Sequence, residues 1–178
     1  WDQRMLLALY RAAFTVAVAL FVITVPLWLF SRKRRSTLFK RLGWQSFPRH
    51  PHSRSGTPER KPVWIHALSI GELLSAGSLI PRLRGELGGR PLYVSVSTAS
   101  AFAMAQDRFG RSCDGIFYFP YDVAFAVTRC LDAVDPALIV LVETDIWPGF
   151  LAEVRRRQIP CCLVNGRLSP ESFRAYSR

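Results

Sequence analysis

The sequence contains few of the residues that bind metals or cross-link small domains. Its 178 residues include four cysteines and three histidines. No two cysteines form a C-x-x-C pair, and the adjacent Cys161 and Cys162 are expected on opposite faces of a strand. A disulfide framework and a metal site are both disfavoured, so we expect reduced thiols, no metal and no cofactor.

A glycine-rich phosphate-binding fingerprint is also absent. The first strand-to-helix turn reads Ser69-Ile70-Gly71-Glu72, whereas a dinucleotide-binding turn reads G-x-G-x-x-G. The sequence therefore does not predict a nicotinamide or flavin site. The turn instead contains a carboxylate, Glu72, directly after a short apolar run.

Acidic residues are scarce, because 13 Asp and Glu stand against 24 Lys and Arg, for a net charge of +11. The excess is concentrated between Arg32 and Lys61, where Glu59 is the sole acid. Nucleic-acid binding is one interpretation of such charge. No recognition helix or base-stacking strand motif accompanies it, so we favour anionic lipid headgroups as the partner and expect no nucleic acid.

One long hydrophobic run is present. Residues 12–30 contain no charge, and 6–10 extend the run if the charged end of Arg11 reaches toward the interface. Since roughly 20 apolar residues cross a bilayer, we predict a membrane anchor helix over 6–30. The basic juxtamembrane segment and linker over 31–61 then places the rest of the chain in the cytoplasm by the positive-inside rule. The alternative is a helix that lies on the bilayer or enters it only in part.

Strands and helices are expected to alternate over residues 62–178. Apolar runs predict strands over 63–68, 92–97, 116–119, 137–142 and 161–164, and amphipathic patterns predict helices over 72–83, 100–109, 123–134 and 148–158. This alternation predicts an α/β fold, a Rossmann-like parallel sheet with helices on both faces. We expect the strand order 3-2-1-4-5, with strands one and four as neighbours.

Carboxylates follow both of these neighbouring strands, Glu72 after the first and Glu143 after the fourth. Adjacent strands lie about 4.8 Å apart, so both side chains are expected to face one crevice at the carboxyl edge of the sheet. Such a pair supports proton abstraction from a hydroxyl. The plainer alternative for Glu72 is an acid that stabilises the first turn of its helix.

Polar residues near these strand ends have plain interpretations as well as functional ones. His66 is interpreted first as a hydrogen-bonded core histidine. Ser97, Thr98 or Ser100 is a possible cap for the next helix. Arg167 can meet a phosphate, although a turn followed by a helix cap explains most of that segment.

Five short motifs carry a family resemblance. They are His66–Glu72, Phe119–Asp122, Val134–Pro136, Glu143–Pro148 and Asn165–Ser169. In this order and spacing they resemble the 3-deoxy-D-manno-octulosonic acid (Kdo) transferases of lipid A biosynthesis. The resemblance implies the N-terminal half of a GT-B glycosyltransferase, inverting and metal-independent. It also implies transfer of Kdo from CMP-Kdo to the lipid A precursor, lipid IVA, in lipopolysaccharide core biosynthesis.

The resemblance also implies roles for individual residues. Glu72 matches the proposed general base, and Glu143 matches the second catalytic carboxylate, which stabilises the transition state. As the acceptor-binding half, the chain would contact the lipid A precursor through Ser69, Gly71, Ser97, Thr98 and Arg167. The domain would lie at the cytoplasmic face of the inner membrane, next to anionic lipids, held by a single-pass N-terminal anchor.

The chain also departs from the family pattern. Residues 95–101 lack the glycine that usually ends the second strand's turn, and the basic linker 43–62 is atypical. The family continues past the position of Arg178 into a donor domain that binds CMP-Kdo, so we expect this chain alone to be inactive. Met5 is the expected native start. Two alternatives stay open, another membrane-associated GT-B glycosyltransferase with a lipid acceptor and a non-catalytic module that binds anionic lipid.

Overall fold

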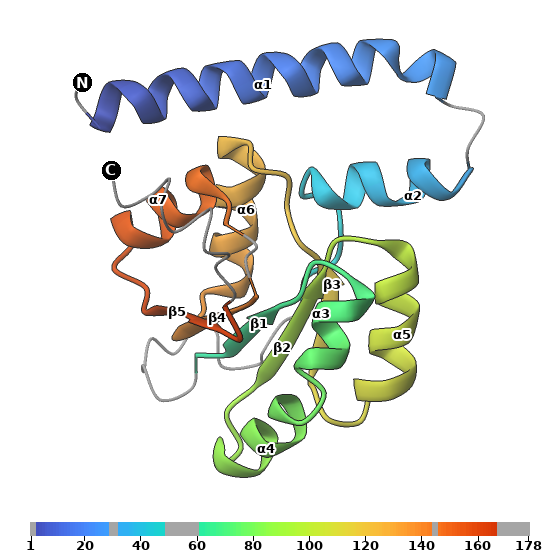
Figure 1. Cartoon of the computed structure of the whole chain (residues 1–178), viewed down its shortest axis with the longest axis vertical. Coiled ribbons are helices and arrows are strands. Elements are labelled where there is room, and N and C mark those ends of the chain that lie inside the picture. Colours follow the sequence, from blue (N-terminus) through green and yellow to red (C-terminus); the bar gives the residue numbers. More distant parts are fainter. Residues whose placement is uncertain (1–2, 29–31, 49–60, 144–145, 167–178) are drawn as a thin grey trace.

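A five-stranded parallel sheet forms the centre of the protein (Figure 1). The structure, a computed structural model, describes residues 3–28, 32–48, 61–143 and 146–166. Within these ranges the strand order is β3-β2-β1-β4-β5, with every neighbouring pair parallel. The predicted sheet and its order are confirmed. The strands are β1 (Val63–His66), β2 (Leu92–Val96), β3 (Gly115–Tyr118), β4 (Leu138–Val142) and β5 (Cys161–Val164).

Helices cover both faces of the sheet, as predicted. On one face lie α3 (Ile70–Ser75), α4 (Leu79–Glu86) and α5 (Ala99–Phe109), and on the other lie α6 (Ala124–Val134) and α7 (Pro148–Arg156). Successive strand residues point to opposite faces. Ile65 therefore packs in the first of these cores, and Trp64 in the second. Burial on both faces explains why the central strands are apolar throughout.

The helix predicted over 72–83 is two helices, α3 and α4, with a break at 76–78. Pro81 has no N–H to donate to the carbonyl four residues back, so an uninterrupted helix would lose a bond there. Gly77 fits tightly within the break, because a Cβ on it would lie 2.8 Å from the carbonyl oxygen of Leu74. The apolar periodicity correctly predicted helical structure here, but it did not reveal the break between the two helices.

The first helix, α1 (Gln3–Trp28), was predicted as the membrane anchor over 6–30. Among the residues that the structure describes, no helix has both the length and the apolarity needed to cross a membrane. The prediction of a spanning anchor is therefore not supported.

One side of α1 packs on the domain and is hydrogen-bonded to it. Figure 1 shows α1 lying along the side of the molecule where α2 (Arg32–Arg41) and the start of α6 are found. Phe14 and Val18 pack against a small buried cluster from α2 and α6, and Arg11 donates to the carbonyl oxygen of Gly149 at 3.5 Å. A polar residue inside the expected anchor is thus used for packing onto the domain, which the hydropathy pattern did not reveal.

Part of the expected linker packs against the edge strand β3. The Gln45 amide donates to the carbonyl oxygen of Tyr118 at 2.7 Å and accepts from its N–H at 2.9 Å. These bonds occupy an edge that would otherwise be open to another strand. Pro48 lies against Gly115 so closely that a Cβ on Gly115 would be 2.3 Å from the Pro48 ring. Residues 43–48 are therefore packed on the domain and are not a loose linker.

This contact gives a test of the packing. Gly115→Ala should lower the free energy of unfolding by about 1–3 kcal/mol, because the added methyl overlaps the proline ring. Gly85→Ala is the matched control, since a Cβ there meets nothing within 4 Å, and it should raise stability by about 0.5–1 kcal/mol within an exposed helix. Urea denaturation measures both. Equal effects of the two changes would contradict the packing of 43–48.

Candidate functional site

The candidate site lies where β1 and β4 end. These strands are paired in the middle of the sheet, with His66 opposite Leu141. The turn that carries Glu72 follows β1, and Glu143 directly follows β4. Two carboxylates distant in the sequence therefore belong to adjacent turns at the carboxyl edge, where ligands bind in open α/β sheets.

Glu72 is held by its own turn. Its carboxylate accepts a hydrogen bond from the N–H of Leu68 and a longer one, at 3.4 Å, from the Ser69 hydroxyl. The Ser69 hydroxyl in turn accepts from the Glu72 N–H at 3.5 Å. Serine at the N-cap with glutamate three residues later is the sequence pattern of a capping box, although here the carboxylate accepts from Leu68, one residue before the cap. The plainer interpretation of Glu72 as a helix-stabilising acid therefore has direct structural support.

The same geometry leaves Glu72 able to act on a ligand. Each carboxylate oxygen has two lone-pair directions, so an oxygen that already accepts one hydrogen bond, as Oε1 does from Ser69, can accept a second. The side chain is half-buried and oriented at a sheet edge. A hydroxyl group that approached Oε1 would meet an acceptor already fixed in place, which is the arrangement a general base requires.

Gly71 leaves the surface bare beside Glu72. It is exposed, and a Cβ on it would have as its nearest neighbour the Ser69 hydroxyl at 3.8 Å. Nothing in the packing of the domain requires glycine there. The open surface leaves room for a ligand there, and the role of Gly71 in the site stays a prediction.

Glu143 has an unusual backbone conformation. Its φ is 66°, in the left-handed region that glycine adopts more easily than glutamate. Its N–H donates to the carbonyl oxygen of Val164 at 2.8 Å, and its carboxylate accepts from the Asn165 amide at 3.4 Å. Such conformations persist where surrounding contacts impose them, and they cluster at functional sites.

The other predicted acceptor residues differ in their surroundings. Thr98 is exposed and caps α5, since its hydroxyl accepts from the N–H of Ala101 at 3.1 Å. Ser97 is buried, and its hydroxyl has no hydrogen-bond partner within the described ranges. The Ser97 N–H donates to the carbonyl of Leu68 at 3.2 Å, which joins this turn to the turn of Glu72. Arg167 lies outside the described residues.

Arg41 is a residue of this edge that sequence reasoning counted only as part of a basic segment. It donates to the carbonyl oxygens of Phe119 at 3.0 Å and Ser97 at 3.5 Å, and its guanidinium lies 4.2 Å from the centroid of the Tyr121 ring. It therefore brings a positive charge to the ends of β2 and β3. In the sequence, Arg41 stands between the apolar residues Leu38 and Leu42. This pattern could have indicated that the end of the helix packs on the domain and brings Arg41 with it.

His66 is a core residue, as its plainer interpretation held. It is fully buried, its Nδ1 lies 2.9 Å from the Ser95 hydroxyl, and its ring stacks on Phe119 with centroids 3.8 Å apart. The Ser95 hydroxyl also accepts from the Trp64 indole at 2.7 Å. This network fixes the ends of β1 and β2 directly beneath the candidate site.

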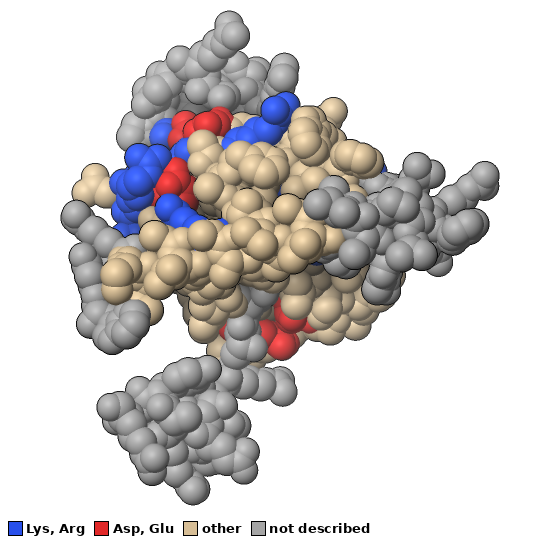
Figure 2. All heavy atoms as spheres, turned by 90° about the horizontal axis from the view of Figure 1, so that it is seen from above, with Lys and Arg blue, Asp and Glu red and all other residues tan. Residues whose placement is uncertain are grey.

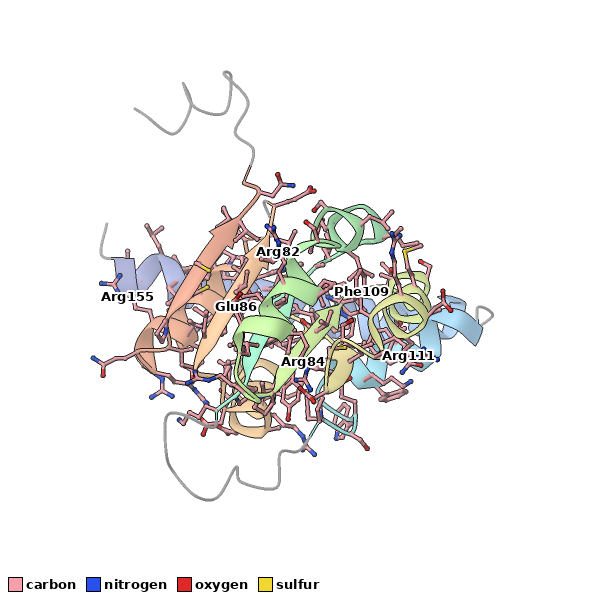
Figure 3. The ribbon with its side chains drawn as sticks, turned by 90° about the horizontal axis from the view of Figure 1, so that it is seen from below. Arg82, Arg84, Glu86, Phe109, Arg111 and Arg155 are labelled. Atoms are coloured by element: carbon pink, nitrogen blue, oxygen red, sulfur yellow. The ribbon has the colours of Figure 1, made fainter. Side chains whose placement is uncertain are left out.

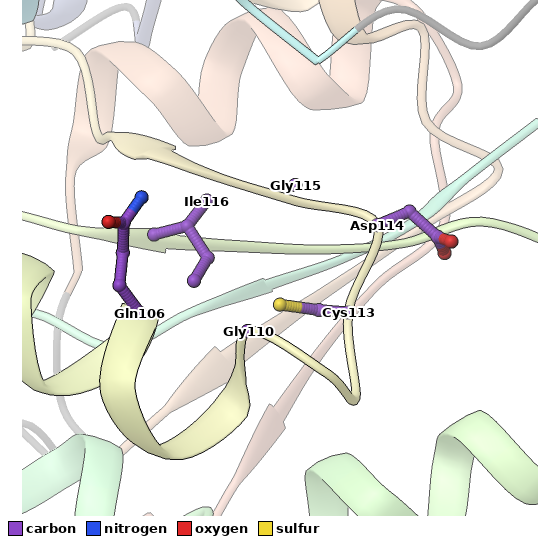
Figure 4. A pocket seen from close by; sticks show the side chains of 6 residues that line it. All are labelled: Gln106, Gly110, Cys113, Asp114, Gly115 and Ile116. Atoms are coloured by element: carbon purple, nitrogen blue, oxygen red, sulfur yellow. The ribbon is translucent and has the colours of Figure 1, made fainter.

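A hollow of about 230 Å³ lies at the opposite end of the strands (Figure 4). Two of its polar groups are already used, because the Cys113 thiol donates to the carbonyl oxygen of Phe109 and Asp114 pairs with Arg84 at 2.6 Å. Figure 3 shows Arg84 on α4 at this end. In the described part of the chain, no three His, Cys, Asp or Glu side chains gather as metal ligands. These engaged groups give no support for a second site there.

The arginine run that ends α7 is neutralised in part. Arg156 and Arg157 pair with Glu153 at 2.6 and 2.8 Å, and Arg157 also pairs with Asp132 at 2.7 Å. The hydrogen bonds from Arg156, followed by those from Arg157, lower the pKa of Glu153 to about 2. These two arginines thus stabilise the end of α7 and are not free phosphate ligands.

Taken together, the sheet and its edge define an α/β domain of the Rossmann type, with acidic residues after its two central strands. A family model described as 3-deoxy-D-manno-octulosonic-acid transferase (kdotransferase) matches residues 36–178. The chain belongs to this family, as the sequence motifs implied.

Several curated relatives carry the same name, 3-deoxy-D-manno-octulosonic acid transferase. The one from Bordetella pertussis is 30% identical over 172 residues, covering 92% of this chain and 39% of its own length. Those from Haemophilus influenzae and Chlamydophila psittaci are each 27% identical, over 83% and 88% of this chain. The chain spans 33% and 36% of their respective lengths.

Gly71 offers a test that separates binding from stability. Gly71→Ala should raise the free energy of unfolding by up to about 1 kcal/mol, because alanine suits a helix better and nothing obstructs its methyl. If the surface beside Glu72 holds a ligand, the same change should raise the KM for that ligand. Steady-state kinetics of the full-length protein, with denaturation alongside, measures both. An unchanged KM would remove Gly71 from the site.

The conformation of Glu143 gives a second test. Glu143→Gly should raise the free energy of unfolding by about 1 kcal/mol, because glycine adopts a positive φ without the penalty that glutamate meets. Glu143→Gln keeps the Cβ and should change stability little, which makes it the matched control. Thermal denaturation compares them. Loss of stability in the glycine variant would contradict an imposed left-handed conformation.

Proposed function

We propose that the full-length protein transfers Kdo from CMP-Kdo to a lipid A precursor, with this chain as its acceptor-binding half. Family membership supports this assignment. The observation that carries it within the chain is the position of Glu72 and Glu143 after the two paired central strands. The relatives are named for Kdo transfer, and the chain spans well under half of their length.

Glu72 serves as the general base in the proposed reaction. Its carboxylate removes the proton from an acceptor hydroxyl, and the hydroxyl oxygen attacks the anomeric carbon of Kdo. The new bond between carbon and acceptor oxygen forms as the bond to the phosphate oxygen of CMP breaks, and CMP leaves with the electron pair. Attack from the side opposite the leaving group inverts the anomeric configuration. No metal is needed to activate the nucleophile, because the carboxylate takes its proton.

Glu143 stabilises the transition state. Positive charge develops on the sugar as the bond to CMP breaks, and a carboxylate held at the same edge offsets it. The acceptor rests on the turns after β1 and β2, through Ser69, Gly71, Ser97 and Thr98, with Arg167 beyond β5. The donor binds in the part of the full-length enzyme that lies outside this chain.

The proposed location is the cytoplasmic side of a membrane containing anionic lipid, with α1 lying in the interface. The outer side of α1 exposes apolar residues, namely Met5, Leu6, Leu9, Val16 and Leu20. Next to the α2 end, Phe39, Trp44 and Phe125 form a chain of ring contacts while each remains more than half exposed. Figure 2 shows a broad uncharged area on this side, with charged residues at its border. Exposed apolar residues beside basic ones favour a lipid surface.

The base assignment is tested by Glu72→Gln in the full-length enzyme. Glutamine preserves the capping-box partner, so the thermal midpoint should change little. It cannot accept the proton, so transfer should fall by about 10²–10⁴-fold. Glu86→Gln, an exposed change on α4, is the matched control and should retain full activity. Near-normal transfer by the Glu72 variant would leave this residue with its capping role alone and would reject it as the general base.

Lipid contact is tested by flotation with vesicles. Replacing Phe39, Trp44 and Phe125 together with serine should weaken binding to anionic vesicles by more than tenfold, because three large apolar side chains no longer enter the interface. Added salt should weaken the binding of the unaltered protein as well. Leu163→Ser, at an exposed position on β5, should have no effect. Equal binding by the triple variant would contradict this surface.

A further inference from the structure

Asp122 is a buried carboxylate that the proposed mechanism does not use. It lies in the connection between β3 and α6 and is 2% exposed. Its Oδ2 accepts from the Tyr10 hydroxyl of α1 at 2.7 Å and from the Gly149 N–H at 2.8 Å. A buried carboxylate is costly to keep in a fold, so its retention needs a reason beyond filling space.

The Gly149 N–H belongs to the first turn of α7, and Asp122 supplies the cap for that turn. The residue at the N-cap position, Trp147, gives no side-chain hydrogen bond. The carboxylate also sits against the α-carbon of Gly149, since a Cβ there would lie 2.5 Å from Oδ1. An anionic group at a helix N-terminus stabilises it through both the hydrogen bond and the dipole.

The start of α7 lies close to Glu143 in the chain. Only 144–147 separate Glu143 from α7. At one end of this segment the Glu143 N–H bonds to Val164, and at the other the Trp147 carbonyl accepts from Leu151. The left-handed conformation of Glu143 depends on such outside restraints. A shift of α7 would therefore change the path of the chain at Glu143.

The second donor to Asp122 is the hydroxyl of Tyr10, which belongs to α1. Burial, with Asp122 beside it, raises the pKa of Tyr10 well above its ordinary value. The hydroxyl consequently remains a donor throughout the pH range in which enzymes are assayed. Arg11, the next residue, reaches the carbonyl oxygen of the same Gly149. Arg11 thus bonds to the start of α7 directly, and Tyr10 is linked to it through Asp122.

We infer that Asp122 is a positioning residue for Glu143, and that Tyr10 of α1 acts with it by holding the Asp122 carboxylate in place. The three residues Tyr10, Asp122 and Gly149 form what we call the α7 clamp. Through it, α1 contributes to the geometry of the catalytic edge as well as to contact with lipid. The inference rests on the proposed function of Glu143, although the clamp itself is a geometric feature that can be tested without activity.

The test uses the full-length enzyme in detergent, so that membrane attachment is not a variable. Tyr10→Phe removes only the hydroxyl that donates to Asp122. Its kcat should fall about tenfold, as expected for loss of a hydrogen bond to a charged acceptor, with the KM for both substrates unchanged. Tyr121→Phe is the matched control, because its hydroxyl has no hydrogen-bond partner in the described ranges, and it should behave as the unaltered enzyme.

A double-variant cycle shows whether the effect passes through Asp122. Asp122→Asn keeps an acceptor for the Gly149 N–H but loses the charge, so its kcat should fall at least as far as that of Tyr10→Phe. The double variant should be no worse than Asp122→Asn, because both changes remove one interaction. Additive losses would mean that Tyr10 acts elsewhere and would overturn the inference.

Hydrogen exchange provides a readout independent of turnover. In Tyr10→Phe, but not in Tyr121→Phe, amides in a peptide spanning 142–151 should exchange faster. A lower thermal midpoint with unchanged kcat and exchange would make Asp122 a purely structural residue, and the inference would be wrong. If the unaltered enzyme transfers no Kdo, the proposed function fails. The exchange comparison then still decides whether the clamp holds this segment.

Discussion

The pairing of β1 with β4 is the contact on which the candidate site depends. It places the turn of Glu72 next to the chain at Glu143, although one follows the first strand and the other the fourth. The pairing is secured by strands that are buried on both faces, with Trp64 and Ile65 in separate cores. Hydrogen bonds of Trp64 and His66 with the Ser95 hydroxyl then join β1 to β2 on the other side. A rigid sheet edge is what lets short turns carry chemistry.

Glu72 combines a structural role in its turn with the catalytic role that we propose for it. The capping box orients the carboxylate and stabilises α3, and a base that must meet a hydroxyl benefits from the same orientation. Glu143 is different, because its backbone adopts a conformation that is unfavourable for glutamate. One acid therefore stabilises its turn, whereas the other has to be held in place by its neighbours. The α7 clamp is our account of part of that restraint.

The sequence predicted the sheet, its order and most of its helices, because buried parallel strands and amphipathic helices have strong periodic signals. Sequence reasoning was less successful where the same pattern of apolar or charged residues can arise from two different structures. The apolar run near the N-terminus matched a spanning helix, but Tyr10 and Arg11 use polar groups to dock α1 on the domain. Arg41 looked like one charge among many until its bonds to strand-end carbonyls were seen. Hydropathy and charge counts do not record which face of a helix meets a partner.

By itself the sequence determined the fold class and the family, and it predicted that Glu72 and Glu143 follow two neighbouring strands, since strand patterning and short motifs are local properties. Only the tertiary structure decided how those carboxylates are held, which side of α1 packs on the domain, and that Asp122 joins α1 to α7. These depend on contacts between residues far apart in the chain, such as Tyr10 with Asp122. The sequence shows that both residues are present but not that they lie next to each other in the fold. That proximity determines whether a carboxylate such as Asp122 is exposed at the surface or is buried and caps a helix.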